Sequence, residues 1–429
     1  MMKKLIALVL IAMVLLTGCQ TNGGQSEVVD TKEPTATYEW MAGESLVPSQ
    51  RMGLKRAGVN NADHSIAPNG VYFMCSTNSS ETTGESVSYL LYSDYGSDTV
   101  VKLCGRPDCN HENEDCNAYF ENGCNIFYYN GYLYATESFG SPGSGSECVL
   151  YRLDTDGSNR VVIFDFTKFA KENGADYATC RMIDSGVCHI TTSRWIKEEH
   201  DDGTTGLNSE DVAYYLYHLD DGSMDETKGG YAPLYHCGDV FMTLMNGTRN
   251  GGYNGYDLSI GDWDPETDTV TYLTDHPAMA GFYGREYGYY FRDGAVVRLN
   301  YDTREEKRII ETGLNGSYYV MFFPECLVLL NQSVEATDKN LYIYNWAYEL
   351  VDTIELSYLP DGISPHSALI AETAERLIFT DAIQTWIPKY YIEKSELGTG
   401  NAKIHSFKLP DLPSELLEYW EDLEWLNNG

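Results

Sequence analysis

Asn-Gly and Asp-Gly pairs recur between short apolar runs along most of the chain, and this pattern constrains the fold more than any other feature. Examples are Asn130-Gly131, Asp156-Gly157, Asp221-Gly222 and Asp293-Gly294. Such pairs tolerate positive φ at both turn positions, as the tightest β-hairpins require. Short strands joined by hairpins in this way predict an all-β fold of antiparallel meanders.

The repeating unit is clearest over the 42 residues from Asn125 to Phe166. Four strands are expected in this stretch, at residues 126–129, 132–135, 149–153 and 161–164. A four-stranded meander of this length matches one blade of a β-propeller, because blade repeats are usually ~40–50 residues long.

Similar units open near seven positions along the chain, namely Val71, Asn125, Arg181, Pro233, Phe282, Tyr319 and Leu369. The intervals between these openings run from 37 to 56 residues, as expected for a blade repeat with insertions. The strands expected to close blades include residues 214–217, 270–273, 296–299 and 341–344. We therefore predict a β-propeller of seven four-stranded blades. The alternative is a pair of β-sandwiches, which also consist of short strands with frequent turns.

Segments that flank or interrupt the repeat have a different character. Residues 19–48 are polar and lack periodicity, which is typical of a flexible tether. The propeller domain is expected to span residues 49–409, and within it the charged and small residues from 193 to 212 are interpreted as a solvated surface loop. Residues 410–429 are predicted to form a short C-terminal helical tail, because their apolar residues recur at helical spacing.

The N-terminus has the layout of a bacterial export signal. Lys3-Lys4 precedes an apolar run over residues 5–16, which is too short for a bilayer span of about 20 residues. The run leads directly into Leu16-Thr17-Gly18-Cys19, which resembles the lipobox of bacterial lipoproteins. That resemblance implies that residues 1–18 are a signal peptide and that Cys19 is lipidated, which anchors the protein to the extracytoplasmic face of the cell membrane. The alternative is an ordinary cleaved leader whose site contains a cysteine.

The sequences of the repeated strands and turns resemble those of known β-propeller families. The segments YYNGYLY at residues 128–134 and LYRLDTDGSN at residues 150–159 resemble TolB-like and YWTD-like β-propellers. With the lipobox, the chain is most similar to the propeller lipoproteins of Gram-positive bacteria, and the resemblance covers residues 69–409. It implies a ring that binds a ligand or a protein more often than an enzyme.

The charge of the chain excludes one class of partner. Removal of residues 1–18 leaves 27 basic residues against 64 acidic ones. A chain with such an excess of negative charge repels DNA and RNA, so we expect no nucleic-acid partner.

One cluster of residues has metal-binding chemistry. Cys104, Cys109, His111 and Cys116 follow one another with the spacing Cys-x4-Cys-x-His-x4-Cys. Three thiolates and one imidazole are a donor set for tetrahedral zinc, so these residues are a candidate structural zinc site. The spacing departs from that of common zinc fingers, in which two ligands stand two to four residues apart.

Two other interpretations of the cluster stay open. Export favours oxidation, so Cys104, Cys109, Cys116 and the nearby Cys124 are equally candidates for disulfides, whose connectivity the sequence does not determine. Reduced thiols without a ligand are the third interpretation. The remaining cysteines of the mature chain stand singly in apolar, strand-like contexts and are interpreted as small buried hydrophobes: Cys75, Cys148, Cys180, Cys188, Cys237 and Cys326.

No catalytic residue is assigned, because the chain contains no Gly-x-Ser-x-Gly elbow, His-Glu-x-x-His helix or phosphate-binding glycine loop. The leading hypothesis is a membrane-anchored propeller that binds or scaffolds a protein, peptide or glycan, with ligand-binding residues unknown. Trp195, Trp263 and Trp386 are candidates for contact with a sugar, or for packing between blades. The alternative function is an extracellular propeller enzyme that acts on polysaccharide, with carboxylates from distant blades meeting in the channel. An accessory protein of a membrane complex is a third hypothesis.

Overall fold

The computed structural model describes most of the chain between residues 64 and 413, all of it in the second of two compact units, residues 1–36 and residues 37–429. The described residues are 64–76, 87–106, 108–113, 115–120, 124–137, 148–184, 186–199, 205–227, 233–237, 240–243, 261–264, 269–272, 282–283, 287–300, 303, 305–322, 326–333, 337–345, 347–373, 375–381, 386–413 and 416. The predicted signal peptide, Cys19 and the tether lie outside them.

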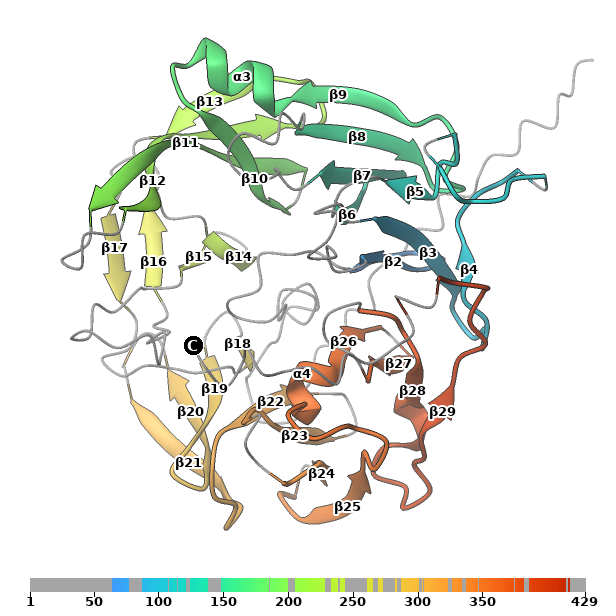
Figure 1. The fold of residues 1–429 in the computed structure, drawn as a ribbon. Helices are drawn as coiled ribbons and strands as arrows, with labels where there is room; N and C mark the ends of the chain where they lie inside the picture. Colours follow the sequence, from blue (N-terminus) through green and yellow to red (C-terminus); the bar gives the residue numbers. More distant parts are fainter. Residues whose placement is uncertain are drawn as a thin grey trace, which may run out of the picture. The chain divides into compact units, whose positions relative to one another are not determined.

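The described strands form seven antiparallel sheets, which follow one another in chain order (Figure 1). Sheet 1 contains β1 (His64–Ala67), β2 (Gly70–Ser76), β3 (Ser88–Asp94), β4 (Val101–Lys102) and β5 (Tyr119–Phe120), with β5 beside β3. Sheet 2 contains β6 (Cys124–Tyr129), β7 (Tyr132–Glu137), β8 (Val149–Asp154) and β9 (Val161–Asp165). Sheet 3 contains β10 (Tyr177–Asp184), β11 (Val187–Glu199), β12 (Thr205–His218) and β13 (Met224–Thr227).

The second half of the chain repeats this meander. Sheet 4 contains β14 (Pro233–Cys237), β15 (Val240–Thr243), β16 (Gly261–Asp264) and β17 (Thr269–Tyr272). Sheet 5 contains β18 (Phe282–Tyr283), β19 (Tyr287–Arg292), β20 (Ala295–Asn300) and β21 (Glu306–Glu311). Sheet 6 contains β22 (Tyr318–Phe322), β23 (Leu327–Asn331), β24 (Asn340–Tyr344) and β25 (Leu350–Glu355). Sheet 7 contains β26 (Leu369–Glu372), β27 (Arg376–Phe379), β28 (Tyr390–Glu393) and β29 (His405–Ser406).

Helices are few and short in the described part of the chain. α3 (Phe166–Glu172) begins where sheet 2 ends, and the Asp165 side chain caps it by accepting from the Lys168 amide at 2.8 Å. α4 (Pro365–Ala368) begins after Ser364, whose hydroxyl accepts from the Ser367 amide, and η1 (Lys394–Glu396) follows β28. α3 and α4 add a few buried side chains to the neighbouring cores, namely Phe166, Ala170 and Ala368, and the sheets supply most of the rest.

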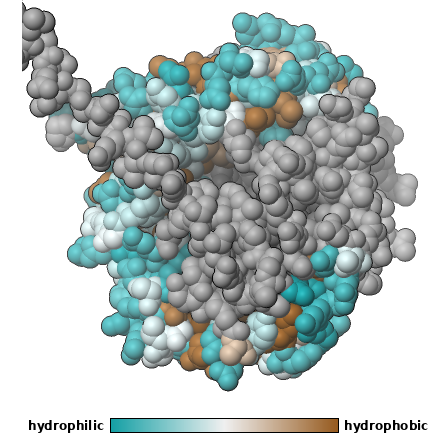
Figure 2. Space-filling model, turned by 180° about the vertical axis from the view of Figure 1, so that it is seen from behind, coloured by the Kyte–Doolittle hydropathy of each residue, from teal (hydrophilic) through white to brown (hydrophobic). Residues whose placement is uncertain are grey.

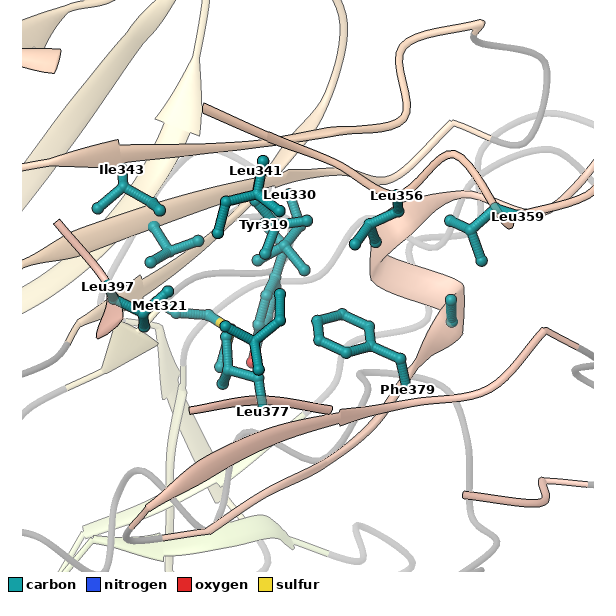
Figure 3. Close-up of a cluster of buried hydrophobic side chains, with 14 of the residues drawn as sticks. Tyr319, Met321, Leu330, Leu341, Ile343, Leu356, Leu359, Leu377, Phe379 and Leu397 are labelled. Atoms are coloured by element: carbon teal, nitrogen blue, oxygen red, sulfur yellow. The ribbon is translucent and has the colours of Figure 1, made fainter. Parts of the chain in front are cut away.

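The core lies between successive sheets. Figure 3 shows one of these cores, in which Leu330, Leu341 and Ile343 of sheet 6 face Leu377 and Phe379 of sheet 7. Because β23 is covered on both faces, all of its residues are buried and its apolar residues run without alternation, whereas burial partly alternates along β24. Further cores join sheet 1 to sheet 2 and sheet 2 to sheet 3.

The last sheet packs against the first. Ile370, Ile378 and Tyr391 of sheet 7 share a buried core with Val71 and Phe73 of sheet 1, and Figure 1 shows the red strands of sheet 7 next to the blue strands of sheet 1. Such closure, together with the repeated four-stranded meander, identifies the fold as an all-β propeller and not as a pair of sandwiches.

Hydrogen bonds reinforce this closure. Thr99 and Lys408 form a parallel bridge, in which the Val100 amide donates to the Lys408 carbonyl at 2.9 Å and the Lys408 amide donates to the Asp98 carbonyl at 2.7 Å. The buried Arg376 guanidinium also donates to the carbonyl of Ser97. We refer to these interactions of residues 97–100 with Lys408 and Arg376 as the closing contacts.

The predicted fold class is confirmed, and the number of blades stays a prediction. Buried cores join sheets 6, 7, 1, 2 and 3 in succession, and β19 contacts β22 between sheets 5 and 6. Figure 2 shows that the described surface on one face is largely hydrophilic, as expected for so acidic a chain.

Most predicted blade openings lie at the start of the first strand of a sheet. Arg181 lies inside β10, which begins four residues earlier at Tyr177. Val71 is wrong by a whole strand, because it lies in β2 and the short β1 precedes it. The four strands predicted between Asn125 and Phe166 correspond to β6, β7, β8 and β9.

Two other predictions need correction. Residues 214–217, 296–299 and 341–344 belong to third strands, β12, β20 and β24, and a fourth strand follows each of them. Within the predicted loop, residues 193–199 and 205–212 are strand, since β11 and β12 pair from Ser193 with Asp211 to Glu199 with Thr205. The tail predicted to be helical, residues 410–429, falls mostly outside the described residues, although Leu416 is described and is buried in the core between sheets 7 and 1.

Candidate metal centre

The four predicted zinc ligands lie in one connection of sheet 1, between β4 and β5. We call residues 103–118 the cluster loop; Pro107 and Glu114 within it lie outside the described residues. The loop begins with the Leu103 amide donating to the carbonyl of Leu90 at 2.9 Å, so its first residue is still held by β3. It ends as β5 pairs with β3, and both ends of the loop are therefore fixed to the same strand.

The structure brings the four side chains together. One ligand atom from each of Cys104, Cys109, His111 and Cys116 lies within 4.8 Å of the others, and His111 Nδ1 is 3.2 Å from the Cys116 sulfur. Zinc–sulfur bonds of about 2.3 Å place two sulfurs of a tetrahedral site about 3.8 Å apart. The donor set and its spread therefore fit one small ion, and disulfides among the three cysteines stay the alternative.

Local turns explain how residues separated in sequence converge. The Cys109 amide donates to the Arg106 carbonyl at 3.3 Å, and the Cys116 amide donates to the Asn113 carbonyl at 3.0 Å. The Arg106 guanidinium spans the loop and donates to the Asp115 carbonyl at 2.6 Å. Between these turns His111 has a φ of 59°, a left-handed conformation in which histidine is enriched among non-glycine residues.

Backbone amides also point at the sulfur atoms. The amide of His111 donates to the Cys109 sulfur and thereby lowers the pKa of that thiol. The Ala118 amide donates to the Cys116 sulfur at 3.4 Å. Hydrogen bonds to sulfur of this kind favour the thiolate, which is the form that binds metal.

Burial shifts the pKa values of Cys116 and His111 in opposite directions. It raises the pKa of the Cys116 thiol to about 12, so this sulfur needs a nearby cation to become a thiolate at neutral pH. Burial also lowers the pKa of His111, and the charges of Lys102 and Arg106 lower it further. The imidazole is therefore neutral at pH 7, as a metal ligand must be.

The cluster loop also contacts sheet 2. The turn between β8 and β9 approaches so closely that a Cβ on Gly157 would lie 2.3 Å from the Leu103 carbonyl oxygen. Beside it, the Tyr72 hydroxyl donates to the Thr155 carbonyl at 3.0 Å, and Arg160 donates to the Tyr119 carbonyl at 2.7 Å. The candidate site thus lies where the first two sheets join.

Cys124 is the one cysteine of the predicted disulfide set that does not converge with the others. It lies in β6, is buried in the core between sheets 1 and 2, and its amide donates to Ser88 Oγ at 3.3 Å. The assignments of zinc or disulfides at Cys104, Cys109, His111 and Cys116 stay predictions.

The structure reveals a thiol pair that sequence reasoning missed. Cys180 and Cys188, interpreted above as single cysteines, have their sulfur atoms 2.7 Å apart. They stand eight positions apart on the antiparallel neighbours β10 and β11, and this spacing could have signalled a pair within a hairpin.

The tryptophans have structural neighbours. Trp195 lies against Tyr177 with ring centroids 4.6 Å apart, and Trp386 packs on the core between sheets 7 and 1. The side chain of Trp263 lies outside the described part of the chain. Among the described residues, none of the helices has the length and apolar character to cross a bilayer.

No protein-family model matches the chain, and no curated protein matches it. Among solved structures it is similar to the β-propeller domain of the Trilobed protease from Pyrococcus furiosus, at 13% identity over 68% of this chain and 80% of that one, with a TM-score of 0.36. A putative TolB from Agrobacterium tumefaciens matches at 13% identity over 78% and 99% of the two chains, with a TM-score of 0.30. Likeness at this level is remote, and the propeller assignment rests on the sheets and shared cores of this chain.

Proposed function

We propose that the chain is a lipoprotein, anchored through acylated Cys19 to the extracytoplasmic face of the cell membrane, whose propeller binds a protein, peptide or glycan. The observation that carries the proposal is Leu16-Thr17-Gly18-Cys19, which begins at the last residue of the apolar run and precedes a propeller domain. Two acyl chains suffice for stable anchoring, whereas one gives only marginal binding. The polar residues 19–48 would let the ring move relative to the membrane.

Metabolic labelling tests the anchor. The full chain, produced in a bacterium that processes lipoproteins, should incorporate labelled fatty acid and partition into detergent. Cys19→Ala should lose the label completely, while Ser26→Ala in the same polar segment should keep it. A mature N-terminus elsewhere than Cys19, or label that persists in Cys19→Ala, would contradict the proposal.

Binding is tested separately from anchoring. The full chain in detergent should bind saturably to a member of a glycan or peptide array, and the binding should disappear when the chain is unfolded by heat. Release of new reducing ends from a polysaccharide would instead favour the enzyme and would overturn the binding role.

We further propose that Cys104, Cys109, His111 and Cys116 hold one structural zinc ion. The convergence of their ligand atoms within 4.8 Å supports this assignment, as do the amides directed at two of the sulfurs. A bound cation would favour the thiolate of the buried Cys116. The ion would fix the cluster loop against sheet 2.

Metal analysis tests the zinc site. Full chain purified under reducing conditions should contain about one zinc ion per molecule and should keep it in a weak chelator. Cys104→Ser and His111→Ala should each lose most of the zinc and melt at a lower temperature, whereas Cys326→Ser, which changes a buried cysteine just before β23, should keep the metal. A disulfide between Cys104 and Cys109 or Cys116 in freshly isolated protein would exclude zinc.

A further inference from the structure

A second group of thiols lies in sheet 3, away from the cluster loop. Cys180 in β10 pairs with Ile190 of β11, and Cys188 stands two residues before Ile190. Residues two apart in a strand share a face, so both cysteines point to the same side of the sheet. A register shift between Cys180 and Met182 accompanies this diagonal approach, and the two sulfur atoms lie 2.7 Å apart.

The two cysteines differ in exposure. Cys188 is fully buried in the core between sheets 2 and 3, whereas Cys180 is partly exposed at its border. A disulfide bond of about 2.05 Å requires the sulfurs to move only about 0.7 Å closer. Little rearrangement of the core is therefore needed to join them.

We propose that Cys180 and Cys188 form a disulfide that links β10 to β11 when the chain meets a low-molecular-weight disulfide such as oxidised glutathione. This site is independent of the anchor, the ligand and the candidate zinc site. It makes sheet 3 an oxidisable element of the propeller, because a bond then joins its first two strands covalently.

The chemistry balances as two thiol–disulfide exchanges. The thiolate of the accessible Cys180 attacks one sulfur of oxidised glutathione, forms a mixed disulfide and releases one glutathione thiolate. The Cys188 sulfur then attacks Cys180 Sγ, closes the intramolecular disulfide and releases the second glutathione. The two protein thiols lose two electrons and two protons, which the two released glutathione molecules carry.

Burial raises the pKa of Cys188 well above the ordinary value for a thiol. This favours Cys180 as the residue that reacts first with the external disulfide, in agreement with its exposure. Cys148, buried in the same core, is the competing partner for Cys188.

Peptide mapping distinguishes these pairings. Native full chain is incubated with oxidised glutathione, its remaining thiols are alkylated, and it is unfolded and cut with trypsin. Cleavage after Lys171, Arg181 and Arg194 places Cys180 in the peptide 172–181 and Cys188 in the peptide 182–194. We expect these peptides to be joined, with a mass two hydrogens below their sum, and to separate on reduction.

Variants serve as controls for the map. Cys180→Ser and Cys188→Ser should each lose the joined peptides, and Cys148→Ser should retain them. Oxidation should raise the melting temperature of the wild type but not that of Cys180→Ser. Two results would overturn the proposal: complete alkylation of both cysteines after oxidation, or linkage of peptide 182–194 to the peptide that contains Cys148. Both results are read from the wild-type chain, so they do not depend on how well the variants fold.

Discussion

At Gly157 two constraints fall on one residue. Its φ is +79°, and a Cβ there would lie 2.3 Å from the Leu103 carbonyl oxygen, where the cluster loop meets sheet 2. Gly157→Ala should therefore cost about 1–2 kcal/mol for the left-handed backbone and about 1–3 kcal/mol more for the clash. Urea unfolding of the two proteins measures the difference.

Gly96 provides the matched control for Gly157. Its φ is +73°, but no atom lies within 4 Å of an added Cβ. Gly96→Ala should thus show only the backbone cost of about 1–2 kcal/mol. Equal losses in the two variants would mean that the close approach to Leu103 is unimportant.

The conformation of a single residue could be predicted from the sequence where it depends only on neighbouring residues. Asn130-Gly131 and Asp293-Gly294 both have positive φ at each position, as the dipeptides predict. At Asp156-Gly157 only the glycine has positive φ, because this turn is one residue longer and closes from Asp154 to Ser158. The Cys180–Cys188 contact depends on a register shift, which alternation of side chains does not reveal.

Among the strands, those buried on both faces were the easiest to predict from the sequence. Middle strands such as β23 are buried on both faces and stand out as apolar runs. Outermost strands such as β13 and β21 meet solvent and carry the sequences MDET and EKRIIE, so their apolar pattern is weak. The same reason made the long hairpin of β11 and β12 look like a charged loop, because beyond Ser193 no other described strand pairs with either of them.

A buried charge lies where sheet 7 meets sheet 1, and its removal should destabilise the fold. Arg376 of β27 is 8% exposed in its side chain, pairs with Glu393 at 2.8 Å, and lies 4.2 Å from the centre of the Tyr391 ring. Arg376→Met keeps the volume but leaves Glu393 and the Ser97 carbonyl without this donor. We expect a loss of about 3 kcal/mol in the free energy of unfolding, measured by urea titration.

An exposed ion pair within the closing contacts, Lys408 with Asp98, is the control. Lys408 and Asp98 lie 2.7 Å apart, but their side chains are 73% and 47% exposed. Lys408→Ala keeps the backbone bridge and should cost far less stability than Arg376→Met, because solvent screens an exposed ion pair. A loss in Lys408→Ala as large as that in Arg376→Met would show that burial of Arg376 does not matter.

Across the whole molecule, the chain contains 34 tyrosines, and many lie where water is excluded. Burial raises the pKa of Tyr72 and of Tyr95 to about 12, and raises that of Tyr358 well above the ordinary value. Burial also raises the pKa of Tyr92 in sheet 1 and of tyrosines in other sheets, namely Tyr134, Tyr217, Tyr290, Tyr318 and Tyr344. The propeller therefore holds a large set of phenols in the neutral form.

This set predicts alkaline unfolding. In the unfolded chain a tyrosine ionises near pH 10, whereas in the folded chain Tyr72 and Tyr95 keep their protons to about pH 12. Between these values the folded state binds more protons than the unfolded state, so the free energy of unfolding falls as pH rises. The contribution is fully present below pH ~10 and is lost as pH rises through about 12.

Urea unfolding at a series of pH values, with tyrosinate absorbance recorded in parallel, tests this expectation. The unfolding free energy should fall steeply above pH ~10, and much of the tyrosinate should appear only as the chain unfolds. Tyr72→Phe keeps the buried ring but removes the hydroxyl that donates to the Thr155 carbonyl, so it should be about 1 kcal/mol less stable at neutral pH and should fall less steeply above pH ~10. If all tyrosines instead ionised near pH 10 in a chain that stayed folded, the rings packed between the sheets would have to be open to water, and the buried cores that join neighbouring sheets would be wrong.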